Sequence, residues 1–549
     1  MKTWFKSGSP WIWLSASAVS VSLIMVLGLI GLIAIRGLGI YWPSEIQQVD
    51  VQKVDGTIET LIGETYDSEM VSRTRLEEAG VKLEGNAQLF ERTLFKVGNR
   101  EIYGVDFKWV LNDKIQSEIN PQEIVVFERR EWGNLYGFIE GIKENGVLTP
   151  TSDVWVSFQE RVDRAMALHD QIKDIERGDI GKVNAVLERL RLDEKKAALK
   201  GSISAEFANE LEQKKAKQNE IYAGLQKQLA VLYDEIKRDQ VVVKVASGQS
   251  VEISLSEVVR VWMPNNMSLF DKIGFYATSV WLFVSEEPRE ANTEGGIFPA
   301  IFGTVMMVLI MSVIVTPFGI VAAVYLREYA PQGFITRTIR IAVNNLAGVP
   351  SIVYGVFGLG FFVYFLGGNI DQLFFPEALP APTFGTPGIL WASLTLAILT
   401  VPVVIVATEE GLSRVPKNVR EGSLALGATK WETLWKTVLP MASPAMMTGL
   451  ILAVARAAGE VAPLMLVGVV KLAPSLPLDM TFPYLHLDRK FMHLGFHIYD
   501  VGFQSPNVEA ARPLVYATAL LLIVVIIFLN LAAVSVRNRL REKFKGYDN

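Results

Sequence analysis

The stretch from Glu421 to Pro440 reads EGSLALGATKWETLWKTVLP, and it decides how the rest of the chain is interpreted. After Gly427, apolar residues recur at helical spacing, in the order Trp431, Leu434, Trp435 and Val438. Glycine tolerates a positive φ, so Gly427 is the expected turn residue between this pattern and the apolar residues before it. The stretch therefore predicts a short helix, a glycine turn and a second helix that Pro440 ends.

Basic residues lie just before and within this stretch, namely Arg414, Lys417, Arg420, Lys430 and Lys436. Loops rich in Lys and Arg stay on the cytoplasmic side of a membrane. We therefore expect a two-helix knob on the cytoplasmic face, which is a surface suited to docking a protein partner.

The composition requires both a membrane part and a soluble part. Half of the 549 residues are hydrophobic, and the mean hydropathy is +0.28. Between Arg36 and Gly296 the chain has 33 Lys and Arg against 44 Asp and Glu, a net charge of −11, whereas the remainder carries +6. The absence of cysteine from the sequence excludes disulfides, thiolate catalysis and cysteine-based metal sites.

Six apolar segments are long enough to cross a membrane, at about 16–35, 297–325, 340–366, 387–410, 442–470 and 513–536. The first is interpreted as an uncleaved anchor, because no Ala-x-Ala cleavage site follows it. An even number of spans places both termini on one side. Basic residues mark that side as the cytoplasm, from Lys2 and Lys6 at one terminus to Lys545 at the other.

The acidic segment between the first two spans must then face outward, and its pattern changes along its length. Short β-rich runs occupy about 49–150, including 100–112 and 123–139. Apolar residues at three- and four-residue spacing over 152–239 predict a helical hairpin or a short antiparallel coiled coil. Residues 241–262 predict two strands around Ser247 and Gly248. We expect an extracytoplasmic α+β insert.

Arg456 and Glu460 lie within the fifth predicted span, four residues apart and therefore on one helix face. An ionisable residue at such a depth costs roughly 3 kcal/mol unless it faces the bundle interior or a partner. Two interpretations are open. The pair locks helix packing, or Arg456 offers a cation to a passing anion while Glu460 holds it in place.

The sequence gives little support for a metal site, an ATP site or a nucleophilic serine. His493 and His497 have the spacing of a helical zinc pair, but Leu494 stands where a metalloprotease helix carries Glu, and no third ligand follows. We interpret this segment as an amphipathic external surface and expect no metal. The sequence also contains no GxxxxGK[ST] run and no serine nucleophile motif. Any ATP must be bound and hydrolysed by another subunit.

Glu421, Gly427 and the pair Leu439 and Pro440 reproduce the spacing of the EAA loop of ABC importer permeases, with Gly422 and Ser423 in place of the middle alanines. The flanking runs GGIFPAIFGT (295–304), AAVYLREYAP (322–331), GVPSIVYGVFGLG (348–360) and ARAAGEVAPL (455–464) resemble the A-type permease subunit of phosphate ABC importers. The resemblance covers the first span and about residue 295 to the C-terminus.

This resemblance implies an α-helical polytopic membrane protein with a six-helix core of the type I ABC importer permeases. It divides the chain into 1–40 with the first span, an extracytoplasmic domain at 41–292, a permease core at 293–540 with the coupling loop at 413–440, and a tail at 541–549. Glu421, Gly427, Leu439 and Pro440 would couple to the ATPase, and Arg456 and Glu460 would line the phosphate pathway.

The resemblance also implies a set of partners. These are a sister permease, an ATPase dimer that uses ATP and Mg²⁺, an extracytoplasmic phosphate-binding protein and membrane lipid, with no nucleic acid. The chain itself would bind no cofactor and catalyse no reaction. Its expected location is the bacterial inner membrane, with both termini cytoplasmic and the large domain periplasmic.

One departure from the family bears on the substrate. Members often show Arg-Thr-Thr-Glu-Glu at the end of the fourth span, where this chain has Val406 to Glu410, VATEE. If phosphate passage needs a second positive charge, that charge must come from the partner permease or from another residue. A permease for sulfate or molybdate, or a membrane-anchored sensor or scaffold, is the alternative function.

Overall fold

The computed structural model describes residues 8–53, 56–78, 80–81, 87–149, 153–505 and 508–544. Lys2, Lys6 and the tail from residue 545 onward, which served to orient the termini, lie outside these residues. The chain separates into two compact units. The core unit comprises Met1–Ile40 and Phe283–Asn549, and the insert unit comprises Tyr41–Leu282.

Within the described residues, the core unit has six helices that are long and apolar enough to cross a membrane, which confirms the predicted number. The first three are Trp11–Gly39 within α2 (Ser9–Gly39), Phe298–Tyr329 beginning with α9 (Phe298–Val324), and Ser351–Phe374 beginning with α11 (Ser351–Phe357). The others are Ile389–Arg414 (α13), Lys430–Gly459 ending with α16 (Leu439–Gly459), and Ala511–Arg539 within α19 (Val508–Phe544).

Two of the predicted spans had wrong bounds. The third begins at Ser351 rather than at 340, because Pro350 disfavours a helical conformation in the residue before it and separates off α10 (Phe334–Leu346). The fifth begins at Lys430 rather than at 442 and ends at Gly459 rather than at 470.

Helix α13 lies at the centre of the core unit and packs against α9 and α16. Glycines allow these close approaches. A Cβ on Gly319 of α9 would lie 2.6 Å from Val404, and one on Gly449 of α16 would lie 2.6 Å from Ala407. Helix α16 also packs against α19, and α2 packs against α19 at Gly37. In the interior of the core unit, small residues therefore allow the helices to pack closely against one another.

The insert unit contains two antiparallel sheets, with strand orders β4-β3-β2-β1-β5 and β10-β9-β7-β6-β11. The first sheet consists of β1 (Ile46–Gln52), β2 (Ile58–Ser72), β3 (Leu89–Lys96), β4 (Phe107–Leu111) and β5 (Ile115–Ile119). The second consists of β6 (Val125–Arg129), β7 (Leu135–Glu144), β9 (Asp239–Lys244), β10 (Ser250–Ser254) and β11 (Val258–Trp262), with β8 (Val147–Thr149) pairing β7.

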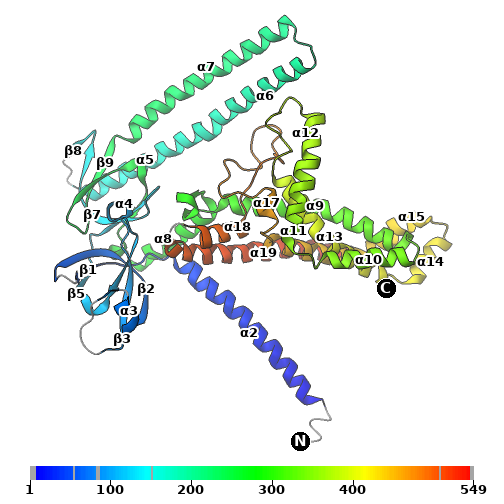
Figure 1. Cartoon of the computed structure of the whole chain (residues 1–549), viewed down its shortest axis with the longest axis horizontal. Helices are drawn as coiled ribbons and strands as arrows, with labels where there is room; N and C mark the ends of the chain where they lie inside the picture. The colour runs from blue at the N-terminus through cyan, green and yellow to red at the C-terminus, as the bar shows by residue number, and fades with distance from the viewer. Residues whose placement is uncertain are drawn as a thin grey trace. The chain divides into compact units, whose positions relative to one another are not determined.

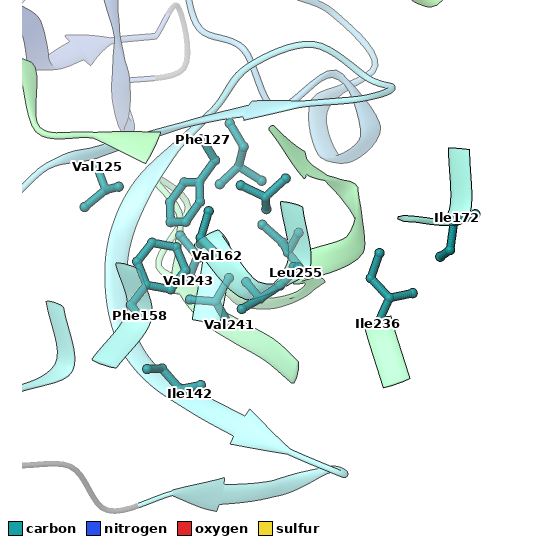
Figure 2. Packing of buried hydrophobic residues seen from close by; sticks show 14 of the residues in the cluster. Val125, Phe127, Ile142, Phe158, Val162, Ile172, Ile236, Val241, Val243 and Leu255 are labelled. Atoms are coloured by element: carbon teal, nitrogen blue, oxygen red, sulfur yellow. The ribbon is translucent and has the colours of Figure 1, made fainter. Parts of the chain in front are cut away.

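The second sheet buries its apolar face under α5 (Val154–Lys173). Along β9, Val241 and Val243 are fully buried and alternate with less buried neighbours. Figure 2 shows Phe127 of β6 beside Phe158 of α5, and their ring centroids are 5.7 Å apart in an edge-to-face arrangement. This cluster is the main hydrophobic core of the insert unit.

A long helical hairpin extends from this core. Helix α5 continues through a π-helical segment (Asp174–Asp179) into α6 (Ile180–Leu199), and α7 (Ala205–Ile236) returns beside α6 (Figure 1). Lys215 Nζ lies 2.6 Å from Glu194, and the Tyr233 hydroxyl donates to Glu176 at 2.5 Å. These contacts fix an antiparallel register.

Two details of the insert differ from the sequence predictions. Residues 100–112 begin with a helical turn, α4 (Arg100–Tyr103), because Gly104 at φ 73° ends that turn before β4. Residues 241–262 form three strands rather than two, since a 3₁₀ turn at Leu255–Glu257 separates β10 from β11. In addition, helix α8 (Leu269–Ser285) was not predicted.

Candidate functional site

The knob, defined as residues 417–433, has the predicted local structure. Helix α14 (Lys417–Ala425) is followed by Gly427 at φ 89° and then by α15 (Lys430–Thr433). A capping box starts α15, because Thr429 Oγ1 accepts from the Glu432 N–H at 3.2 Å and the Glu432 carboxylate accepts from the Thr429 N–H at 3.0 Å. The Ser423 and Thr433 hydroxyls, 3.0 Å apart, join the two helices.

The prediction that Pro440 ends the second helix is wrong. A π-helical segment (Leu434–Val438) follows α15, and α16 continues from it as far as Gly459. Pro440 occupies the first turn of α16, where its fixed φ suits the helix, and the wider turn just before it accommodates its missing N–H. The knob and the fifth span therefore share one continuous helix, Lys430–Gly459.

Polar contacts fix the knob to the end of the second span. Arg420 Nη1 lies 2.6 Å from Glu328 Oε1, and both side chains are mostly buried. Arg420 Nη2 donates to the Leu412 carbonyl, and Lys430 Nζ donates to the Glu328 carbonyl, each at 2.5 Å. An apolar cluster lies beneath, made of Leu412, Val415, Leu434, Val438, Ala442 and Met446.

The outer side of the knob and of the turn that follows it is apolar and exposed. Leu426, beside the glycine turn, is 91% exposed. Trp431 and Trp435 are about 60% exposed, and their rings stack at 5.8 Å with an interplanar angle of 15°. Large exposed apolar groups gathered in this way mark an interaction surface. Trp431 and Trp435 were not among the predicted site residues, although their four-residue spacing next to Lys430 and Lys436 was a usable signal.

The four residues predicted for coupling fall into two places. Glu421 and Gly427 are exposed on the knob. Leu439 and Pro440 lie half-buried at the start of α16. The structure thus places Glu421 and Gly427 on the knob and the other two in the helix that leads away from it.

Arg456 and Glu460 form a contact, but not on a continuous helix. Arg456 Nε lies 3.6 Å from Glu460 Oε1. Helix α16 ends at Gly459, and Glu460 has the extended conformation φ −79°, ψ 133°. Arg456 therefore lies in the last turn, where the helix dipole favours a cation, and not midway along the predicted span. The side chains are 33% and 21% exposed, so the pair is partly accessible.

A cation does reach the acidic end of the fourth span. Val406, where the resemblance led us to expect Arg, is 45% exposed. One turn on, Glu409 Oε1 accepts from Arg340 Nε of α10 at 3.1 Å. Arg340 Nη2 also donates to the Leu326 carbonyl at 3.0 Å. Sequence reasoning missed this pair because its members are 69 residues apart.

His493 and His497 do not form an external surface. Both lie at α18 (Leu494–Tyr499) and are buried, with 0% and 2% exposure. His493 Nδ1 accepts from the Gly495 N–H at 3.1 Å, and His497 Nδ1 lies 3.4 Å from the Thr518 hydroxyl. Burial lowers the pKa of His493 to about 3 and that of His497 to about 4. Among the described residues, no group of three or more His, Asp or Glu is placed to hold a metal.

A core of six spans joined to an exposed helical knob has the architecture expected of a membrane permease subunit. The family described as binding-protein-dependent transport system inner membrane component matches residues 315–542. The probable ABC transporter permease protein YqgI of Bacillus subtilis is 32% identical over 257 residues, which cover 46% of this chain and 81% of that protein. The phosphate transport system permease protein PstA 1 of Mycobacterium tuberculosis is 36% identical over 245 residues, 44% and 71% of the two chains.

A third relative is the phosphate transport system permease protein PstC of Xylella fastidiosa, 33% identical over 207 residues, 36% of this chain and 64% of that protein. The chain belongs to the family of binding-protein-dependent transport system inner membrane components.

Proposed function

We propose that this chain is the membrane permease subunit of an ATP-driven importer for inorganic phosphate and forms half of the translocation pathway. Relatives named as phosphate permeases support the substrate. The single observation that carries the mechanism is at the knob, where the exposed Trp431, together with Trp435 just after it, lies on the same continuous helix as the fifth span. ATP hydrolysis belongs to a separate ATPase subunit.

In this proposal the knob is the coupling element on the cytoplasmic side. Glu421 and the turn at Gly427 dock into a groove of the ATPase, with the stacked Trp431 and Trp435 beside them. Two ATPase copies with ATP and Mg²⁺, a sister permease resembling PstC and an extracytoplasmic phosphate-binding protein complete the importer. Closure of the ATPase pair moves the knob, and Leu439 and Pro440 pass that motion into α16.

The Arg456–Glu460 pair is our candidate for the substrate pathway. Arg456 is partly accessible and lies near the end of the fifth span, because α16 ends at Gly459 and the next helix begins only at Leu464. A cation in such a place can attract a phosphate anion, while Glu460 holds the guanidinium in position. A mutual lock on helix packing is the competing role for the pair.

The insert unit is assigned to the periplasmic side of the bacterial inner membrane, with both chain termini in the cytoplasm. Its net acidic composition supports this side, because basic loops are retained in the cytoplasm. Its helical hairpin is proposed to act as a short antiparallel coiled coil, with Leu229, Leu232 and Ile236 buried near the base.

The coupling role is tested by substitutions in the knob. We expect Glu421→Ala and Gly427→Val to reduce phosphate uptake at least tenfold while the protein still inserts in the membrane. A valine at φ 89° forces the turn to change, whereas Gly422 is helical with open space around it. Gly422→Ala, which restores a family alanine, is therefore the matched control and should transport normally. Normal uptake by both Glu421→Ala and Gly427→Val would overturn the assignment.

The substrate is tested separately by competition. Uptake of labelled phosphate should be unaffected by a hundredfold excess of sulfate or molybdate. Strong competition by either anion would replace phosphate with that oxyanion and leave the permease role intact.

A further inference from the structure

Helix α8 (Leu269–Ser285) has an apolar face that is exposed along its length. Phe270 is 85% exposed, Ile273 is 49% exposed and Trp281 is 67% exposed. Spacings of three and eight residues place them on one side of the helix, together with Ala277 between them. This face, which we call the α8 face, carries no charged residue.

The opposite side of α8 is fixed to the insert unit. The Phe275 ring lies 4.8 Å from that of Trp262, and the Arg260 guanidinium lies 4.7 Å above the same Phe275 ring. Arg260 Nη1 also donates to the Ser279 hydroxyl at 2.9 Å. Because these contacts hold one side of the helix inward, the orientation of the α8 face is determined.

Helix α8 contacts the chain segments that flank two membrane spans. Near its midpoint, the Tyr276 ring lies 6.0 Å from that of Trp42, which follows the end of α2 by three residues. Just beyond its C-terminal end, the Phe298 N–H, at the start of α9, donates to the Glu286 carbonyl at 3.0 Å. The spans α2 and α9 follow one another in the chain. The C-terminal end of α2 and the N-terminal end of α9, which the insert unit connects, therefore lie at the same membrane surface.

The length and charge of α8 fit a helix that lies on a membrane better than one that crosses it. It has 17 residues, fewer than the roughly 20 that a spanning helix needs, and Asp271 and Lys272 lie in its first turn. Helices that lie in the interface bury Trp, Phe and aliphatic side chains among the lipids. A Trp near one end, such as Trp281, is typical of that depth.

We propose that α8 is an interfacial helix whose exposed face is buried in the lipid surface from which α2 and α9 emerge, anchoring the insert unit to the membrane. The occupant of the α8 face is therefore phospholipid. This inference rests on the six spans and not on which ion is carried, so a failure of the phosphate assignment would leave it standing.

The absence of cysteine from the sequence makes a direct test possible. Single variants Ile273→Cys and Ala277→Cys of the full chain would carry spin labels in nanodiscs of phosphatidylethanolamine and phosphatidylglycerol. Collision rates with oxygen, which concentrates in lipid, and with a water-soluble nickel chelate would be compared. Val231→Cys, at a 63% exposed apolar position on α7, is the aqueous control, and Gly28→Cys on α2 is the lipid control.

We expect the labels at 273 and 277 to favour oxygen over nickel at least fivefold, as at 28, and the label at 231 to favour nickel. Nickel access at 273 and 277 equal to that at 231 would overturn the proposal. Low access of both reagents would also overturn it, because a protein surface and not lipid would then cover α8. A second variant, Phe270→Asp, should move the label at 277 toward water while circular dichroism stays unchanged.

Discussion

Helices α2 and α13 are almost equally hydrophobic, with mean hydropathies of 2.7 and 2.5 in their most apolar windows, yet they occupy opposite environments. None of that window is buried within the chain in α2, whereas 67% is buried in α13. Hydropathy therefore identifies a span but not its place in the bundle. In a lipid solvent, apolar residues gain little by leaving the surface, so something else must select the interior helix.

Small and hydroxyl-bearing residues determine which helix lies in the interior of the bundle. Helix α13 buries Ser393, Thr395, Thr400 and Thr408. The Ser393 hydroxyl donates to the Met307 carbonyl of α9 at 3.2 Å and so joins two helices, whereas Thr395 bonds back to Trp391 in its own helix. Glycines on the neighbouring helices let backbones approach α13 closely.

The largest effect should come from filling an interior contact. Gly449→Leu places a side chain where even a Cβ lies 2.6 Å from Ala407 of α13, while Gly28→Leu on α2 has nothing within 4 Å. We expect Gly449→Leu to destabilise the purified chain by about 3 kcal/mol, the upper range for overpacking, and Gly28→Leu to have almost no effect. Thermal unfolding followed by size-exclusion chromatography in detergent measures both. Equal losses in the two variants would remove the distinction between the helices.

Protonation of the buried His497 should have the next largest effect on stability. The folded pKa of His497 is lowered to about 4, so as the pH falls below about 6.5 the unfolded chain takes up a proton before the folded chain does. Stability should therefore fall from pH 6.5 toward pH 4, by roughly 2 kcal/mol at pH 5 from this histidine. Unfolding of the wild type and of His497→Gln at pH 7 and pH 5 should show a smaller loss in the variant. The same loss in both would place the titration elsewhere.

A smaller effect is expected at the knob. Glu328→Gln removes a mostly buried partner of Arg420, while Glu410→Gln removes an exposed partner of Arg414. The first should raise hydrogen exchange across residues 417–433 about fivefold, equivalent to roughly 1 kcal/mol, and the second should leave it unchanged. Exchange mass spectrometry of the two variants decides between these outcomes, and a matching rise in Glu410→Gln would contradict the importance of burial.

The smallest effect on stability is expected from the removal of a buried hydroxyl group. Ser393→Ala loses a hydrogen bond between α13 and α9, whereas Ser15→Ala in α2 loses only an exposed bond to Ile12 of its own helix. Interhelical bonds of this kind average about 0.6 kcal/mol, so a small but measurable difference in unfolding is expected for Ser393→Ala alone. A larger cost for Ser15→Ala would reverse the ranking.

The sequence was sufficient where a local property decided the structure. Six apolar runs predicted six spans, and Gly427 marked a turn that needs positive φ. It was insufficient where distant contacts decided. Pro440 lies inside a helix because a π-helical turn precedes it, and His493 is buried because the core packs around it.

Predictions of the candidate site show the same division. The spacing of Arg456 and Glu460 correctly brought the two side chains into contact, but the end of the helix at Gly459 was not visible in an apolar run. The contact between Arg340 and Glu409 joins separate helices, so no local sequence pattern predicts it. Helix α8 was missed because it is a short segment between strands and a span.

The continuous helix Lys430–Gly459 has a mechanical consequence. Trp431 at the exposed apolar end and Arg456 in the last turn are 25 residues apart on this one rod, about 38 Å along its axis. A rod of that length amplifies small rotations, since a tilt of about 5° at one end displaces the other by about 3 Å. Glu460 directly follows the end of the helix and moves with it, so a slight rocking at the knob is enough to displace the Arg456–Glu460 pair as a unit by about that distance.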